Sequence, residues 1–89
     1  GVFSIVLECV EKNLAKEITN SISIPTIGIG SSNNCDGQVL VTDDILGLTD
    51  SKVKFVKKFT DIKRAIYFAV KKFKNEVKSK KYPTKKYSY

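Results

Sequence analysis

Two short apolar runs, each ending where polar or small residues take over, constrain the fold of this chain more than any other feature. Residues 3–7 form a nearly continuous apolar run that stops at Glu8, and residues 24–30 form a second run that opens into a loop of small and polar residues. Strands covered on both faces have such continuous apolar sequences, and parallel sheets present functional side chains at their carboxyl ends. The pattern predicts a parallel α/β sheet with Glu8 at the end of a buried strand.

The segment between the two runs has the periodicity of a helix. Over residues 13–22 the apolar side chains fall on one helical face, namely Leu14, Ala15, Ile18 and Ile22. Pro25 fits only the start or edge of a strand, so the second strand is expected over residues 26–29. Gly28 and Gly30 indicate that something approaches the backbone closely there, either a neighbouring part of the chain or a ligand.

The middle of the chain predicts a further helix and a further strand. Asp36 is a suitable N-cap, and the apolar spacing that follows predicts a helix over about residues 37–46, with Gly47 just beyond it. The Val-Leu-Val centre of this segment, residues 39–41, is also compatible with a strand. Residues 52–57 nearly alternate between apolar and charged, as a short strand does.

The last third of the chain predicts one long helix and a tail. Apolar side chains keep helical spacing from Ile62 to Val77 after a Thr60-Asp61 cap, whereas residues 79–89 lack periodicity and are predicted to be extended. We therefore expect one domain over residues 1–78 and a lysine-rich tail over residues 79–89. The order β-α-β-α-β-α is too short to close a barrel and would leave two bare sheet edges, so the chain is expected to belong to a larger sheet and to be incomplete on its own.

Composition excludes several classes of protein. At 42% hydrophobic and 28% charged residues the chain is ordinary globular protein, and no apolar stretch approaches the ~20 residues of a membrane span. Residues 1–7 do not resemble a secretion signal, so a cytoplasmic location is expected. With two cysteines, Cys9 and Cys35, and no histidine, neither a disulfide framework nor a zinc site is predicted.

The net charge of +7 is concentrated at one end of the chain. Residues 71–89 carry eight lysines and one acidic residue, whereas the charges of residues 1–70 balance. The favoured interpretation is a solvated lysine-rich face and tail. The alternative is a basic nucleic-acid-binding module that uses the Lys/Tyr-rich C-terminus, but no known binding motif accompanies the charges, so nucleic acid is not the expected partner.

Five ordered blocks and the ending of the chain resemble one enzyme family. The blocks are Val6-Leu7-Glu8-Cys9-Val10, Ile24-Pro25-Thr26-Ile27-Gly28-Ile29-Gly30, Cys35-Asp36-Gly37-Gln38-Val39-Leu40-Val41, Asp44-Ile45-Leu46-Gly47-Leu48 and Lys54-Phe55-Val56-Lys57. Together with the Tyr82-Pro83 ending, they resemble the C-terminal third of ketopantoate hydroxymethyltransferase. The resemblance extends over the whole chain.

The resemblance implies the last three β/α units, about strands 6–8, of a (β/α)8 TIM barrel, in a homo-oligomer that is usually a decamer. It implies a transferase that moves a hydroxymethyl group from 5,10-methylenetetrahydrofolate to 3-methyl-2-oxobutanoate, forming 2-dehydropantoate for pantothenate and coenzyme A. Mg²⁺ holds the 2-oxo acid in this family. Its ligands, two aspartates and a glutamate, and a substrate-binding lysine would lie upstream of Gly1, with no metal ligand in this chain.

Glu8 matches the family's glutamate that removes the proton from C3 of the oxo acid, and such a step requires a positioned base. Gly28 and Gly30 are candidate substrate-binding residues. Asp36 is interpreted as a cap, and Asp43 and Asp44 as part of a solvated face. Without the metal-binding part the chain is expected to be inactive alone, and a non-catalytic fragment is the second alternative.

The sequence departs from the family pattern at several positions. Glu11 stands where the family commonly has proline, and Ser31-Ser32 stand where it has Ala-Gly. None of these changes removes the proposed base. Serine allows less backbone freedom than glycine, which bears on how this loop approaches folate or substrate.

Overall fold

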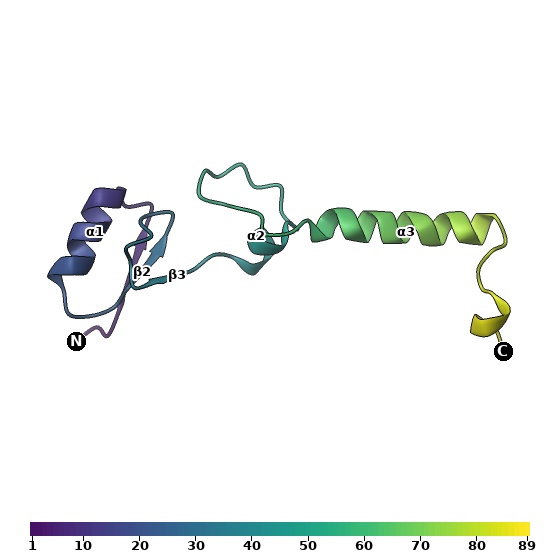
Figure 1. Cartoon of the computed structure of the whole chain (residues 1–89), viewed down its shortest axis with the longest axis horizontal. Coiled ribbons are helices and arrows are strands. Elements are labelled where there is room, and N and C mark those ends of the chain that lie inside the picture. The colour runs from purple at the N-terminus through teal and green to yellow at the C-terminus, as the bar shows by residue number, and fades with distance from the viewer.

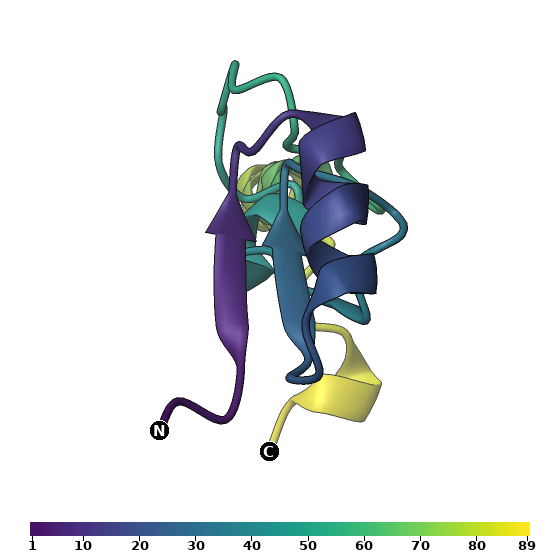
Figure 2. The ribbon, with the colours of Figure 1, turned by 90° about the vertical axis from the view of Figure 1, so that its left-hand side faces the viewer.

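The computed structural model describes all residues from Gly1 to Tyr89, and its first half is built on a parallel sheet. The sheet has three strands in the order β1 (Ile5–Glu8), β2 (Thr26–Ile29) and β3 (Gly37–Gln38). Figure 2 shows β1 and β2 side by side and pointing the same way. The prediction of an α/β fold with a parallel sheet is therefore confirmed.

One face of this sheet is covered by α1 (Lys12–Ser21). Leu7 from β1, Ala15 from α1 and Cys35 from the loop before β3 form the buried cluster, with Val10 and Ile18 packed against it. The opposite face is open, because Val6 is 57% exposed. Residues 1–89 thus cover one face of the first strand with a helix, and cover of its other face stays a prediction.

Thr26 and Asp36 join β2 to the loop that precedes β3. The Asp36 carboxylate accepts hydrogen bonds from the backbone amide of Thr26 at 2.8 Å and from its hydroxyl at 3.3 Å. Thr26 is fully buried, so these bonds satisfy donors that no water reaches. The prediction that Asp36 caps a helix is wrong, because its carboxylate bonds backward in sequence.

The predicted helix over residues 37–46 is also wrong in its first half. Residues 37–38 pair with β2 instead, and only α2 (Thr42–Leu46) is helical. Val39 donates its amide to the carbonyl oxygen of Gly28 at 3.0 Å, which extends the pairing beyond β3. Gly47 ends α2 in the left-handed conformation at φ 72°, as the sequence predicted for the residue after the helix.

Residues 52–57 form no strand, although their sequence alternates. Val56 donates its amide to the carbonyl oxygen of Val53 at 3.1 Å, which folds the segment into a turn. Phe59 then returns to α2 by donating its amide to the carbonyl oxygen of Ile45 at 2.9 Å. The segment pairs with none of the three strands of the sheet, and its Phe55 side chain lies against Gly30 instead.

The long helix α3 (Ile62–Lys78) leads away from the sheet, as Figure 1 shows. Asp61 caps it as predicted, by accepting a hydrogen bond from the Arg64 amide at 3.1 Å. The radius of gyration is 21.8 Å, against about 12 Å for a compact chain of this length. No residue of α3 is buried, and in the middle of its apolar stripe Ile66, Val70 and Phe73 are each more than half exposed.

The tail is only partly extended. A single 3-10 turn, η1 (Lys85–Tyr87), interrupts it, which the sequence did not predict. Tyr82 lies near Phe73 with ring centroids 5.5 Å apart, so aromatic contacts hold the start of the tail against the end of α3. None of the helices, α3 included, combines the length and the apolar character that crossing a membrane requires.

Candidate functional site

Glu8 is the last residue of β1 and projects from the open face of the sheet. Successive side chains of a strand point to opposite faces, and Leu7 lies in the cluster beneath α1, so Glu8 points the other way. Its partner in register is Ile29, the last residue of β2. The carboxylate is exposed and has no hydrogen-bonding partner in the chain. The strand-end position predicted for Glu8 is therefore confirmed, and its chemical role stays a prediction.

Ser31 fixes the backbone on both sides of Glu8. Its hydroxyl donates to the carbonyl oxygen of Leu7 at 2.6 Å and accepts from the amide of Val10 at 3.0 Å. Cys9 sits between them in the left-handed conformation at φ 54°, and its amide donates to the carbonyl oxygen of Ile29 at 2.9 Å. These three bonds hold the sharp turn from β1 toward α1, so they define where the Glu8 side chain begins.

Gly28 and Gly30 are closely approached, and the neighbours are parts of the chain itself. A Cβ atom at Gly28 would lie 3.0 Å from Cys35 Sγ and 3.0 Å from Gln38 Oε1. Gly30 has φ 64°, and a Cβ there would lie 2.6 Å from Cδ1 of Phe55. Both glycines thus have a packing role, while their contact with a substrate remains a prediction.

A cavity of about 590 Å³ opens at the carboxyl end of the sheet, one residue beyond Glu8. It is an open cavity between the turn after β1, the start of α1, the loop after β2 and the turn formed by residues 53–56. The lining residues are Cys9, Val10, Glu11, Lys12, Gly30, Ser31, Lys54 and Phe55. We call it the rim cavity. Its place matches the face where α/β barrels bind their ligands.

The charges around the rim cavity are unequal. The Glu11 carboxylate accepts from the amides of Leu14 at 3.0 Å and Asn13 at 2.9 Å, so it caps α1. These bonds lower the pKa of Glu11 below its ordinary value of 4.5. Lys12 and Lys54 are exposed, and neither forms an ion pair, since the one salt bridge of the chain joins Lys63 to Asp50. The ammonium groups of Lys12 and Lys54 thus form no ion pair, whereas the Glu11 carboxylate is held by two backbone amides.

The residues present do not fit a magnesium site. No three His, Cys, Asp or Glu side chains lie close enough together to hold a metal ion. Asp44 accepts a hydrogen bond from Thr49, and Asp43 lies exposed in the first turn of α2. Cys9 and Cys35 are free thiols, one exposed and one buried.

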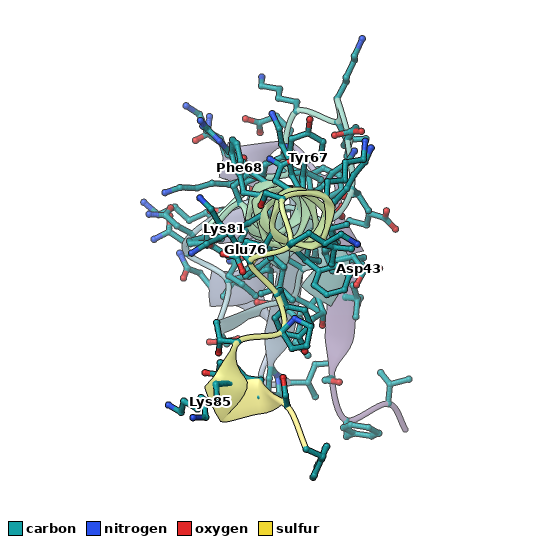
Figure 3. The ribbon with its side chains drawn as sticks, turned by 90° about the vertical axis from the view of Figure 1, so that its right-hand side faces the viewer. Asp43, Tyr67, Phe68, Glu76, Lys81 and Lys85 are labelled. Carbon is teal, nitrogen blue, oxygen red and sulfur yellow. The ribbon has the colours of Figure 1, made fainter.

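The lysine-rich part of the chain forms a cationic surface on α3. Figure 3, which looks along α3, shows side chains spreading on all sides of the helix, with Tyr67 and Phe68 beside each other. Arg64 lies over the ring of Phe68 at 5.4 Å and Lys71 over that of Tyr67 at 5.8 Å. The solvated face predicted for these lysines agrees with their exposure.

Sequence reasoning missed Ser31, Lys54 and Phe55 as members of the site. Phe55 and Gly30 are 25 positions apart, and Ser31 and Leu7 are 24 apart, so no local pattern relates them. The pair of glycines did signal a close approach, although not which residue makes it. Glu11 was visible only as a departure from a family pattern, whereas its position just before an apolar helical pattern marks a cap.

Comparison with known proteins identifies relatives of the chain. The sequence profile of a family described as ketopantoate hydroxymethyltransferase matches residues 1–85. A protein of Pelagibacter ubique named 3-methyl-2-oxobutanoate hydroxymethyltransferase is 61% identical over 89 residues, which cover 100% of this chain and 35% of that protein.

Proteins with the same name from two other organisms are similar over the same region. That of Carboxydothermus hydrogenoformans is 51% identical over 90 residues, covering 100% of this chain and 33% of the relative. That of Sphingopyxis alaskensis is 49% identical over 89 residues, covering 100% and 31%. The chain thus spans about a third of the length of the curated relatives it matches.

Proposed function

The chain belongs to the ketopantoate hydroxymethyltransferase family, and we propose that it contributes the proton-abstracting base, Glu8, to a complete enzyme of that activity. The reaction moves a hydroxymethyl group from 5,10-methylenetetrahydrofolate to 3-methyl-2-oxobutanoate and yields 2-dehydropantoate. The observation that carries the proposal is the position of Glu8 at the carboxyl end of β1, on the open face of a parallel sheet. Substrates of such folds bind at this end.

In the proposed step, a carboxylate oxygen of Glu8 takes the proton from C3 of the oxo acid. The electron pair of the broken C–H bond forms the enolate, whose C3 then bonds to the one-carbon unit carried by folate. Water adds to that carbon and leaves the hydroxyl on it, and the two bonds from the carbon to the folate nitrogens break. Tetrahydrofolate leaves with one proton from water and the one that Glu8 took from C3. An exposed carboxylate with no hydrogen-bonding partner in the chain is free to accept this proton. Ser31 supports the step by fixing the backbone on either side of the base.

The remaining surfaces of the chain fit a role as one part of a larger barrel. The open face of the sheet and the apolar stripe of α3 are both uncovered within residues 1–89. In the proposal they are covered by the rest of a (β/α)8 barrel, residues 1–78 belong to its catalytic domain, and residues 79–89 are a tail. The residues that would hold Mg²⁺ lie in the rest of the barrel. Assembly into an oligomer and a cytoplasmic location remain predictions of the same proposal.

Exchange of Glu8 tests the role of the base. In the complete protein, Glu8→Gln should lower the turnover number at least ~10²-fold, since it removes a general base. It should also abolish the exchange of the C3 proton of 3-methyl-2-oxobutanoate with deuterium, followed by NMR in the absence of folate. Glu17→Gln is the matched control, because Glu17 is an exposed carboxylate on α1, away from the carboxyl end of the sheet.

Two results would contradict this assignment. Near-normal turnover and C3 exchange in Glu8→Gln, with an unchanged far-ultraviolet circular dichroism spectrum, would remove Glu8 from the proposed step. A complete wild-type protein without transferase activity would overturn the function itself.

A further inference from the structure

The rim cavity has a composition that the proposed proton transfer does not use. Its walls combine the aromatic ring of Phe55 and the branched side chain of Val10 with the ammonium groups of Lys12 and Lys54. A volume of about 590 Å³ lies in the range of small-molecule sites. An aromatic ring joined to carboxylates is the type of ligand that such walls would recognise, because apolar surface and cationic groups line the same cavity.

The two lysines come from segments that only the fold brings together. Lys12 is the first residue of α1, whereas Lys54 lies in the turn that places Phe55 against Gly30. Neither has an acidic partner in the chain. Glu11, the one acidic residue of the lining, is held by the amides of Asn13 and Leu14. The cavity is therefore lined by two ammonium groups that form no ion pair and that come from different segments of the chain.

We propose that Lys12 and Lys54 bind the glutamate carboxylates of the folate co-substrate in the rim cavity, with Phe55 and Val10 contacting its p-aminobenzoyl ring. This inference rests on the proposed function. The cavity begins one residue beyond Glu8 and Ile29, so a ligand bound in it can extend toward the end of β1 where Glu8 lies. Folate carries its one-carbon unit on the pterin side and its carboxylates at the far end. That length would let the one-carbon unit meet the enolate at Glu8 while the carboxylates remain at the rim.

Folate and a shortened analogue separate the roles of the two ends. In the complete enzyme, Lys54→Ala should raise the KM for 5,10-methylenetetrahydrofolate about 5- to 10-fold, as expected for loss of a charge-assisted contact at a partly exposed site. The double variant Lys12→Ala/Lys54→Ala should raise it further. The KM for 3-methyl-2-oxobutanoate should stay unchanged. With 5,10-methylenetetrahydropteroate, which lacks the glutamate, wild type and variants should share one KM.

Matched variants keep the result interpretable. Lys52→Ala removes an exposed lysine two residues away that does not line the cavity, and it should behave as wild type. Lys54→Arg keeps the charge and should restore most of the affinity for folate. Equal KM values for 5,10-methylenetetrahydrofolate in Lys54→Ala and Lys52→Ala would overturn the inference. The proposed function would still stand in that case, provided that the wild type is active. An equal rise of KM with the pteroate analogue would also overturn it, because the lysine would then act on the ring portion. An inactive wild type would instead refute the proposed function.

Discussion

Replacing Gly30 with alanine should destabilise the protein far more than the same change at Gly37, and the structure allows the difference to be worked out. Gly30 has φ 64°, where an L-residue with a Cβ is disfavoured by about 1–2 kcal/mol. The new Cβ would lie 2.6 to 2.8 Å from three atoms of Phe55, so that ring must retreat by 0.6 to 0.8 Å to reach an ordinary contact of 3.4 Å. Overpacking of this kind costs about 1–3 kcal/mol. The sum is a loss of about 2–5 kcal/mol.

Gly37 provides the matched control on the neighbouring strand. A Cβ there would meet only Cγ1 of Ile27, at 3.9 Å, and its backbone is not left-handed. Alanine at Gly37 should therefore change the free energy of unfolding by less than about 1 kcal/mol, and it should stabilise if the unfolded chain loses entropy.

Urea denaturation of the complete protein, followed by circular dichroism, measures both changes. In the double variant Gly30→Ala/Phe55→Ala the loss should be smaller than the sum of the two single losses, because alanine at position 55 removes the clash. Equal stabilities for Gly30→Ala and Gly37→Ala would refute the reasoning, since the ring would then yield without cost and the left-handed backbone would be readily relaxed.

Two further perturbations test the helices. Hydrogen bonds from the amides of Leu14 and Asn13 lower the pKa of Glu11 below 4.5, so the stabilising effect of this carboxylate is present above pH 4.5 and is lost as the pH falls through the lowered pKa. Glu11→Gln should therefore lower the urea midpoint at pH 7, and the difference from wild type should shrink as the pH is lowered below 4.5. Glu17→Gln should leave the midpoint unchanged throughout, and a pH-independent effect of Glu11→Gln would contradict the cap. In the complete protein, Phe73→Asp should lower the free energy of unfolding by at least about 3 kcal/mol if a barrel covers the apolar stripe of α3. Asn75→Asp makes the same charge change on the other face of the helix and should lower it by less than about 1 kcal/mol. Similar losses for the two variants in thermal denaturation would argue against that cover.

The sequence predicted the elements that local patterns determine. The apolar run up to Glu8, the helical spacing before Ile22 and the long helix after Asp61 all lie where expected, within one or two residues. In each case propensity, capping and periodicity agree, so no distant contact is needed to choose the structure.

The failures occurred where a distant contact outweighs the local pattern. Asp36 is a residue type that often caps helices, but its carboxylate instead accepts hydrogen bonds from the buried amide and hydroxyl of Thr26 at the start of β2. The alternating segment around Lys54 folds into a turn because Phe55 packs on Gly30. The same distant contact creates the rim cavity, so the part of the site that needed Phe55 was hidden from the sequence, whereas Glu8 at a strand end was visible.

The contact between Leu7 and Ala15 beneath α1 has a consequence for chemistry as well as stability. Side chains alternate along β1, so a slip of one residue in its pairing with β2 would exchange the two faces of the strand. Leu7 would then meet solvent, and the Glu8 carboxylate would be forced under the helix without a partner, at a large desolvation cost. The apolar pair of Leu7 and Ala15 therefore determines the side of the sheet on which Glu8 lies, and it raises the free energy of the shifted register.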